Sequence, residues 1–274
     1  MAITMAEISK LRTMTGAGMM DCKNALTEAN GDFDKAMETI RKKGQAVAAK
    51  RSDREASEGC VLGVAKGDFA AVLALKCETD FVAKNADFVA LTKEILDLAI
   101  DTKAANIDAL KASALNGSTV EQLVTDRSGI TGEKMELDIY EFVTGPTTVA
   151  YIHPGNKLAT IVAFNQADVD GQVAKDVAMQ VAAMNPVAVA KENVPADIIE
   201  KEKEIAKDKA RQSGKPENIL DKIAEGAMVK YFQENTLLEQ AFIKDGKISV
   251  AQYLNSASKG LTVTSFKRVT LNQD

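Results

Sequence analysis

The sequence predicts an α+β protein made of several units, and three observations lead to this fold class. Apolar residues recur at spacings of three and four through residues 4–52, which is the period of helices that bury one face. An apolar hairpin followed by an amphipathic helix occurs twice, in residues 59–100 and 147–185. Residues 195–233 return to the helical period and carry charges of both signs. Antiparallel hairpins with helices packed on them are typical of α+β folds.

These patterns divide the 274 residues into three predicted domains. We expect a three-helix N-terminal domain with its linker (1–54), a core subdomain N (55–143) and a core subdomain C (144–274), with a helical hairpin inserted at about 196–233 and turning at 212–216. The core subdomains are expected to be related, because the same order of hairpin and helix occurs in both. Residue identity between the two copies is low, so this inference depends on the pattern alone.

The N-terminal domain is expected to contain three short helices. Thr4 and Glu7 fit a capping box at the start of the first helix. A second helix is predicted over residues 19–29, and Asp32 is placed to cap the third. The stretch 41–54 is rich in Lys and Arg, and we interpret it as a partly helical linker.

The core is expected to contain two antiparallel sheets. In the first hairpin the return strand, residues 70–75, is mostly apolar, which predicts a position at the centre of a sheet. The second hairpin pairs strands at 148–152 and 158–164. Residues 135–140 alternate between apolar and polar side chains, as in a half-exposed strand. A short helix and a strand over 261–269 end the chain.

Composition limits the classes of function. The chain is 46% hydrophobic and 27% charged, which is typical of a soluble globular protein. Its net charge of −5 disfavours direct binding to nucleic acid or to anionic membranes, since both require an excess of Lys and Arg. No apolar run approaches the ~20 residues of a membrane span, and we see no signal peptide. Three cysteines without a Cys-x-x-Cys pair indicate a reducing compartment, so we expect a cytoplasmic protein.

No set of residues in the sequence indicates catalysis. The chain has one histidine, and its cysteine spacings do not match a zinc site. Neither of the common glycine-rich nucleotide-binding motifs is present. We therefore expect a binding protein that is not an enzyme and that uses no metal and no cofactor.

The strongest candidate site is the stretch from Cys77 to Lys84, where a predicted strand is followed by a helix. Loops on a rigid scaffold often carry function. Phe81 is either an exposed anchor for a partner or an apolar residue that staples the helix start to the core. Asp80 is either a charge directed at a partner or the N-cap of the helix.

Four more residues are weaker candidates. Met19 and Met20 are adjacent in a helix and cannot both face inward, and an exposed Met suits an adaptable contact surface. Arg12 is either a contact residue or a solvated helix charge. His153 is either a contact residue or an ordinary turn residue.

Three stretches together form a recognisable series: Leu11-Arg12-x-x-Thr15-Gly16-Ala17-Gly18-Met19-Met20-Asp21-Cys22-Lys23, Cys77-x-Thr79-Asp80-Phe81-Val82-Ala83-Lys84 and Gln212-Ser213-Gly214-Lys215-Pro216. In order and spacing, along essentially the whole chain, they resemble the signatures of the elongation factor Ts family. Members of this family are guanine-nucleotide exchange factors for elongation factor Tu, the GTPase that delivers aminoacyl-tRNA to the ribosome.

The resemblance implies a ubiquitin-associated-like three-helix N-terminal domain, a core of two related antiparallel sheet-plus-helix subdomains and an inserted antiparallel coiled-coil hairpin. It also implies that Asp80 approaches the magnesium site of elongation factor Tu, while Phe81 enters between helices of its GTPase domain. Thr79 and Val82 flank these two residues in the motif, and we expect them to bind the same partner. Further contacts with the same domain are implied for Arg12, Met19, Met20 and His153.

The expected function is therefore guanine-nucleotide exchange in translation elongation. The partner would be elongation factor Tu in its GDP or nucleotide-free form, without direct contact with nucleic acid or membrane. A one-to-one complex and a dimeric assembly both remain open. The alternatives are a helical adaptor or chaperone-like interaction protein, an RNA-binding protein that uses residues 41–54, and an enzyme whose turnover depends on His153 or a cysteine.

Overall fold

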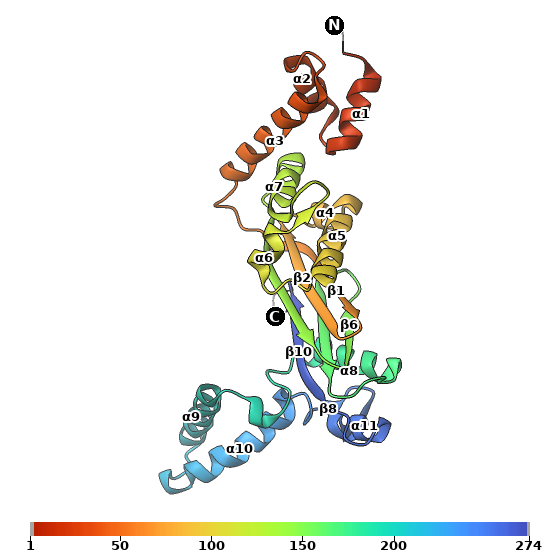
Figure 1. Ribbon diagram of the computed structural model, residues 1–274. Helices are drawn as coiled ribbons and strands as arrows, with labels where there is room; N and C mark the ends of the chain where they lie inside the picture. Colours follow the sequence, from red (N-terminus) through yellow and green to blue (C-terminus); the bar gives the residue numbers. More distant parts are fainter. Residues whose placement is uncertain (1–2, 273–274) are drawn as a thin grey trace. The chain divides into compact units, whose positions relative to one another are not determined.

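The computed structural model describes residues 3–272, and its contacts group into two units. One unit comprises the chain up to Leu62, Leu73–Glu141 and the residues from Leu271 onward; the other comprises Gly63–Val72 and Phe142–Thr270. The structure mixes helices with antiparallel strands, which confirms the α+β class (Figure 1). The three domains predicted above stay a prediction, because a two-way grouping does not test their boundaries.

The described part of the first unit begins with α1 (Met5–Thr15), α2 (Met19–Glu28) and α3 (Phe33–Lys50). The side chains of Thr4 and Asp32 cap α1 and α3 as predicted, and Glu7 completes the capping box. The three helices share a small core of Ile8, Leu11, Ala17, Cys22, Ala25, Leu26 and Ala36. The helix α3 continues to Lys50, so most of the predicted linker is helical. Arg51 is the C-cap residue of this helix.

The remaining elements of the first half are β1 (Glu58–Lys66), β2 (Phe69–Cys77), α4 (Asp80–Ala83), α5 (Ala86–Thr102), α6 (Ile107–Ala112), β3 (Ala114–Leu115), β4 (Ser118–Thr119), α7 (Val120–Thr131) and β5 (Glu136–Thr144). The strand β2 lies between β1 and β5, which confirms its predicted central place. The strict alternation expected for β5 is wrong, since its buried residues are Leu137, Tyr140 and Val143. The Tyr140 hydroxyl donates a 2.8 Å hydrogen bond to the Ala104 carbonyl, which keeps this ring inside.

The elements after β5 are β6 (Thr147–Ile152), β7 (Leu158–Phe164), α8 (Gly171–Met184), α9 (Ala196–Gln212), α10 (Leu220–Asn235), β8 (Ala241–Phe242), β9 (Asp245–Ser249), α11 (Val250–Ala257) and β10 (Val263–Thr270), with short 3₁₀ helices at Lys191–Asn193 and Glu217–Ile219. The strands β10, β7 and β6 form an antiparallel sheet in that order. Val177 and Val181 of α8 share a core with Val162 and Phe164 of β7, so the predicted hairpin-then-helix order is confirmed.

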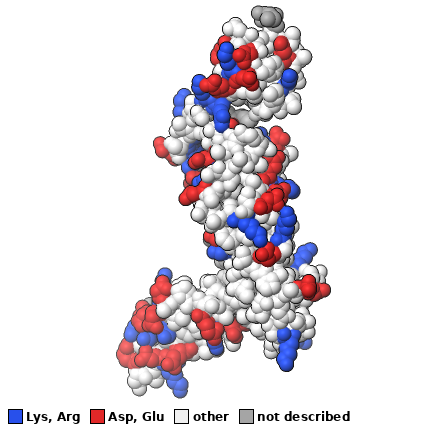
Figure 2. Space-filling model, in the orientation of Figure 1, with Lys and Arg blue, Asp and Glu red and all other residues white. Residues whose placement is uncertain are grey.

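The helices α9 and α10 pack along each other, as the apolar stripe of the second helix predicted. Acidic and basic side chains are interspersed over this pair (Figure 2). The short hairpins β3–β4 and β8–β9 were not predicted, because strands of a few residues leave too little periodicity to detect.

Candidate partner-binding site

The loop between β2 and α5 carries four of the candidate residues. Thr79 is the N-cap of α4, and its hydroxyl oxygen accepts a 3.4 Å hydrogen bond from the N–H of Val82. Asp80 is the first residue of the helix, and its carboxylate pairs with Lys84 at 2.6 Å. The alternative in which Asp80 caps the helix is therefore wrong, because the preceding residue takes that place.

The Phe81 side chain is 85% exposed. The alternative in which it staples the helix to the core is wrong, since the side chain that α4 buries is that of Ala83. Val82, which follows Phe81, is half-buried. A large aromatic therefore projects from a helix that is anchored on its other face.

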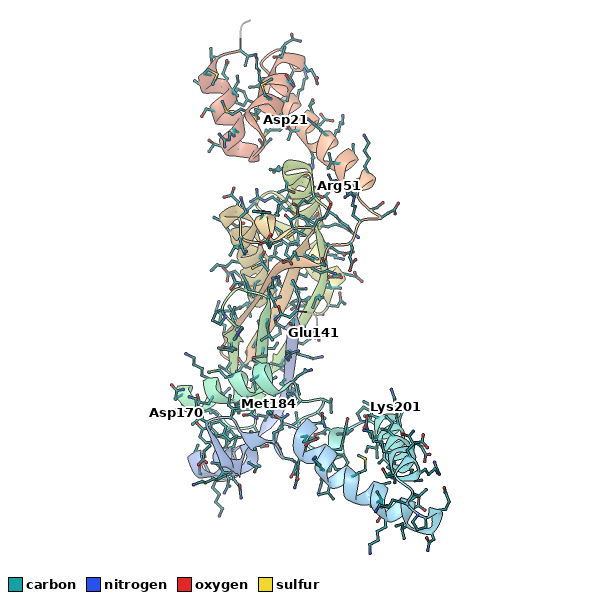
Figure 3. All side chains as sticks on the ribbon, turned by 180° about the vertical axis from the view of Figure 1, so that it is seen from behind. Asp21, Arg51, Glu141, Asp170, Met184 and Lys201 are labelled. Carbon is teal, nitrogen blue, oxygen red and sulfur yellow. The ribbon has the colours of Figure 1, made fainter. Side chains whose placement is uncertain are left out.

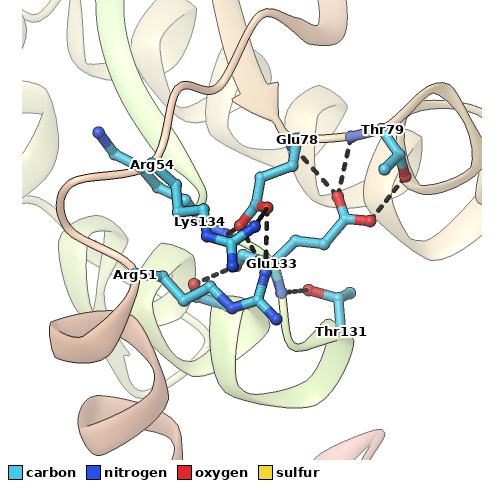
Figure 4. Close-up of polar contacts among 8 residues, drawn as sticks. Arg51, Arg54, Glu78, Thr79, Thr131, Glu133 and Lys134 are labelled. Atoms are coloured by element: carbon cyan, nitrogen blue, oxygen red, sulfur yellow. Dashed lines mark hydrogen bonds and ion pairs between the residues drawn. The ribbon is translucent and has the colours of Figure 1, made fainter.

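Glu133 fixes the backbone that leads into this helix (Figure 4). One carboxylate oxygen accepts hydrogen bonds from the N–H groups of Glu78 (3.1 Å) and Thr79 (3.0 Å). The other accepts a 2.6 Å bond from the Thr79 hydroxyl. Hydrogen bonds to an ionised acceptor are shorter and stronger than those between neutral groups. The two residues before Asp80 are thus held by one side chain.

The Glu78 carboxylate, at the same end of β2, is also bound. It accepts a 2.6 Å hydrogen bond from the N–H of Lys134 and 3.0 Å bonds from Arg51, the C-cap residue of α3 (Figure 3). Arg54 lies 3.7 Å away. The Lys134 N–H is the largest influence on the pKa of Glu78, which is lowered, and Arg51 and Arg54 act in the same direction. Glu78 therefore ties the end of α3 to the start of the candidate loop.

Cys77 is fully buried at the end of β2, and its thiol donates a 3.2 Å hydrogen bond to the Thr79 carbonyl. Burial raises the pKa of Cys77 to about 12, and the negative charge of Glu133 acts in the same direction. The thiol stays protonated near neutral pH, which disfavours a nucleophilic role. Cys22 and Cys60 are also buried.

Arg12, Met19 and Met20 lie on α1 and α2. Met20 is 65% exposed, whereas Met19 packs against the core of the three helices, as their adjacency predicted. Arg12 is exposed in the last turn of α1. Gly16 ends this helix with a φ of +71°, and its N–H donates a 2.7 Å hydrogen bond to the Arg12 carbonyl. A left-handed φ of this kind is the reason that glycine suits the position.

His153 belongs to the second unit and is exposed in the turn between β6 and β7. Its Nδ1 atom lies 3.0 Å from the Tyr151 hydroxyl, and its backbone N–H donates to the Leu158 carbonyl at 2.8 Å. Exposure agrees with both readings of this residue, so its role stays a prediction.

The structure brings Thr79, Asp80, Phe81 and Val82 together on one loop and adds residues that the sequence did not single out. Glu133 bonds to a residue 54 positions earlier, so no local pattern marks it. Glu78 lies inside the motif, yet its side chain faces Arg51 and Lys134 rather than the exposed side of the loop.

Within residues 3–272, no group of three or more His, Cys, Asp or Glu residues is arranged to hold a metal ion. Among the helices described there, none has the length and apolar character needed to cross a membrane.

Comparisons with known proteins agree on one family. A family model described as "Elongation factor TS" matches residues 78–273. A curated relative named elongation factor Ts from Porphyromonas gingivalis is 62% identical over 275 positions, and another from Azobacteroides pseudotrichonymphae is 55% identical over 274. A third, from Bacteroides thetaiotaomicron, is 49% identical over 331 positions, and all three matches cover the whole of both chains. The chain therefore belongs to the elongation factor Ts family.

Proposed function

We propose that this protein is a guanine-nucleotide exchange factor in translation elongation. It binds elongation factor Tu in its GDP form, disturbs the Mg²⁺ and phosphate site, and promotes GDP release so that GTP can bind. Family membership supports the activity. The observation that supports Phe81 as the contact residue is its 85% exposure, on a loop that is hydrogen-bonded to Glu133. The role is one of binding and involves no covalent chemistry.

The proposal extends to the finer features of the fold and to the location. We assign α1–α3 as a ubiquitin-associated-like domain and α9–α10 as a coiled-coil hairpin. The protein acts in the cytoplasm, without direct contact with nucleic acid or membrane. The residues assigned to the interface with elongation factor Tu are Arg12, Met19, Met20, Thr79, Asp80, Phe81, Val82 and His153.

The mechanism is a linkage between two binding events. If this protein weakens nucleotide binding to elongation factor Tu, the nucleotide must weaken binding of this protein by the same factor. Exchange therefore needs a contact that is compatible only with the disturbed nucleotide site. Phe81 supplies it by entering a pocket of the partner, and the Asp80 carboxylate beside it disfavours phosphate. Contacts through Arg12, Met19, Met20 and His153 add affinity and orientation.

The direct test is stopped-flow release of fluorescent GDP from elongation factor Tu, with wild-type protein and with Phe81→Ala. We expect acceleration by the wild type and a loss of roughly ten-fold or more in the variant, because a central aromatic anchor carries much of an interface's energy. The unfolding temperature should hardly change, since the side chain is exposed. Val229→Ala, which truncates another exposed apolar residue, is the matched control and should accelerate release like the wild type.

The competing functions predict other results. A helical adaptor would bind elongation factor Tu, or another protein, without changing the rate of GDP release. An RNA-binding protein would shift RNA in a salt-sensitive manner. No acceleration by folded wild-type protein would overturn the exchange function, and unchanged acceleration by Phe81→Ala would overturn the role of this side chain.

A further inference from the structure

We propose that Glu133 is a positioning residue for exchange: it holds residues 78 and 79 so that Phe81 reaches the partner in one fixed orientation. This inference rests on the proposed function. Glu133 acts through the loop and is not itself assigned to the interface with elongation factor Tu.

Every polar group of Thr79 is bound. Its N–H and its hydroxyl donate to Glu133 at 3.0 and 2.6 Å. Its hydroxyl oxygen accepts from Val82 at 3.4 Å, and its carbonyl accepts from the Cys77 thiol at 3.2 Å and from the Ala83 N–H at 3.1 Å. Because the hydroxyl proton points to Glu133, the oxygen is left to cap α4. The carboxylate therefore sets both the backbone and the cap of this helix.

Glu133 is itself built into the end of α7. Gly132 closes that helix with a φ of +73°, and the next residue, Glu133, donates its N–H to the Thr131 hydroxyl at 3.3 Å. The Glu133 carbonyl accepts a hydrogen bond from the buried Ser128 hydroxyl. Both backbone polar groups of Glu133 are thus bound by residues of α7 and not by the loop.

Phe81 depends on this support because it has little packing of its own. Its side chain is 85% exposed, and α4 has only four residues, too few to be stable alone. An aromatic side chain enters a pocket with less loss of entropy when it is already held in the bound orientation. Without Glu133, two N–H groups and a hydroxyl lose their acceptor, and the loop can leave this conformation.

The experiment measures acceleration of GDP release by Glu133→Ala, Glu133→Gln and Glu136→Gln. Glu133→Ala should lose about ten-fold, which corresponds to ~1.4 kcal/mol. Glu133→Gln should retain most of the acceleration, because its amide oxygen can accept both N–H groups and its amide nitrogen can donate to Thr79. Glu136 lies on β5 and pairs with Lys76 and Lys134 at 3.5 and 3.7 Å, so Glu136→Gln is the matched control and should resemble the wild type.

A double-mutant cycle separates positioning from general destabilisation. If Glu133 acts through Phe81, adding Glu133→Ala to Phe81→Ala should change the rate by less than about two-fold. An equal loss in both backgrounds, or no loss in Glu133→Ala alone, would overturn the proposal. Should Glu133→Ala fail to fold, Thr79→Val removes the hydroxyl bond to Glu133 together with the cap of α4 and keeps the two N–H bonds to Glu133. It should show a smaller loss with the same dependence on Phe81.

Hydrogen exchange of the Glu78 and Thr79 amides provides a readout that needs no partner. Both amides should lose protection in Glu133→Ala and keep it in Glu136→Gln. If both amides kept their protection in Glu133→Ala, the positioning role of Glu133 would be wrong, even with a wild type that accelerates GDP release. A different outcome would separate the two proposals. If Glu133→Ala loses amide protection but the wild type does not accelerate GDP release, the proposed exchange function is wrong and the contact between Glu133 and the loop stands.

Discussion

At the scale of single residues, the structure gives different roles to neighbouring side chains that the sequence could not distinguish. Met19 and Met20 are neighbours, yet one packs in a core and the other is 65% exposed. Asp80 and Thr79 are both good N-cap residues, and Thr79 takes the cap because Glu133 orients its hydroxyl. The candidate site was recognisable from its motif, but the division of roles within it was not.

The buried Cys77 thiol predicts a dependence of stability on alkaline pH. Its pKa is about 12 in the folded protein against an ordinary value of 9.0, so the unfolded chain releases this proton first. Above pH 9 the unfolded state binds fewer protons, and the free energy of unfolding falls as the pH rises toward 12. Tyr140 and Tyr253, whose pKa values burial also raises to about 12, add to this fall.

Urea unfolding at about pH 8 and about pH 10.5 measures this effect for the wild type and for Cys77→Ala. The variant lacks the thiol and keeps both tyrosines, so it should lose less stability between the two pH values. Equal losses in the two proteins would show that Cys77 titrates normally in the folded state.

At the scale of elements, apolar runs and spacing were reliable guides. The apolar sequence of β2 correctly predicted a central strand, and helix periodicity correctly predicted α8 and the α9–α10 pair. The crossing of α3 and α7 was not predicted. These helices meet at Gly44 and Gly129, where a Cβ atom on Gly129 would lie 2.1 Å from the Cα atom of Gly44. Only glycine at position 129 permits this approach.

This crossing predicts different effects on stability for Gly129→Ala and Gly44→Ala. Gly129→Ala should destabilise the protein by about 1–3 kcal/mol, because the added methyl group forces the helices apart. Gly44→Ala meets its nearest atom at 3.5 Å and should be neutral or slightly stabilising, since alanine favours a helix. Thermal and urea unfolding of the two variants give the comparison. Equal effects of the two substitutions would contradict the closer approach at Gly129.

At the scale of the whole molecule, net charge and size say little about the partner. The net charge of −5 argues against a role built on nucleic-acid phosphates, but it names no protein surface. The motif series, the family model and the full-length relatives carry that information. The structure adds a physical explanation of the motif: Phe81 is exposed, and Thr79 is hydrogen-bonded to Glu133.

Linkage then predicts how Phe81 affects affinity. If Phe81 contacts only the disturbed nucleotide site, Phe81→Ala should weaken binding to nucleotide-free elongation factor Tu by about ten-fold and leave binding to the GDP form within about two-fold. Fluorescence titrations with and without saturating GDP measure both affinities. Equal weakening in the two titrations would make Phe81 an ordinary contact rather than the element that couples the two sites.

The sequence by itself determined the fold class, the order of the main elements, the central place of β2 and the motif that marks the candidate loop. These features depend on local periodicity and on residue type. The tertiary structure alone decided that Phe81 is exposed, that Thr79 caps α4 and that Glu133 holds the loop. Exposure depends on what packs around a side chain. The Glu133 contact joins residues 54 positions apart, a distance over which no local pattern extends.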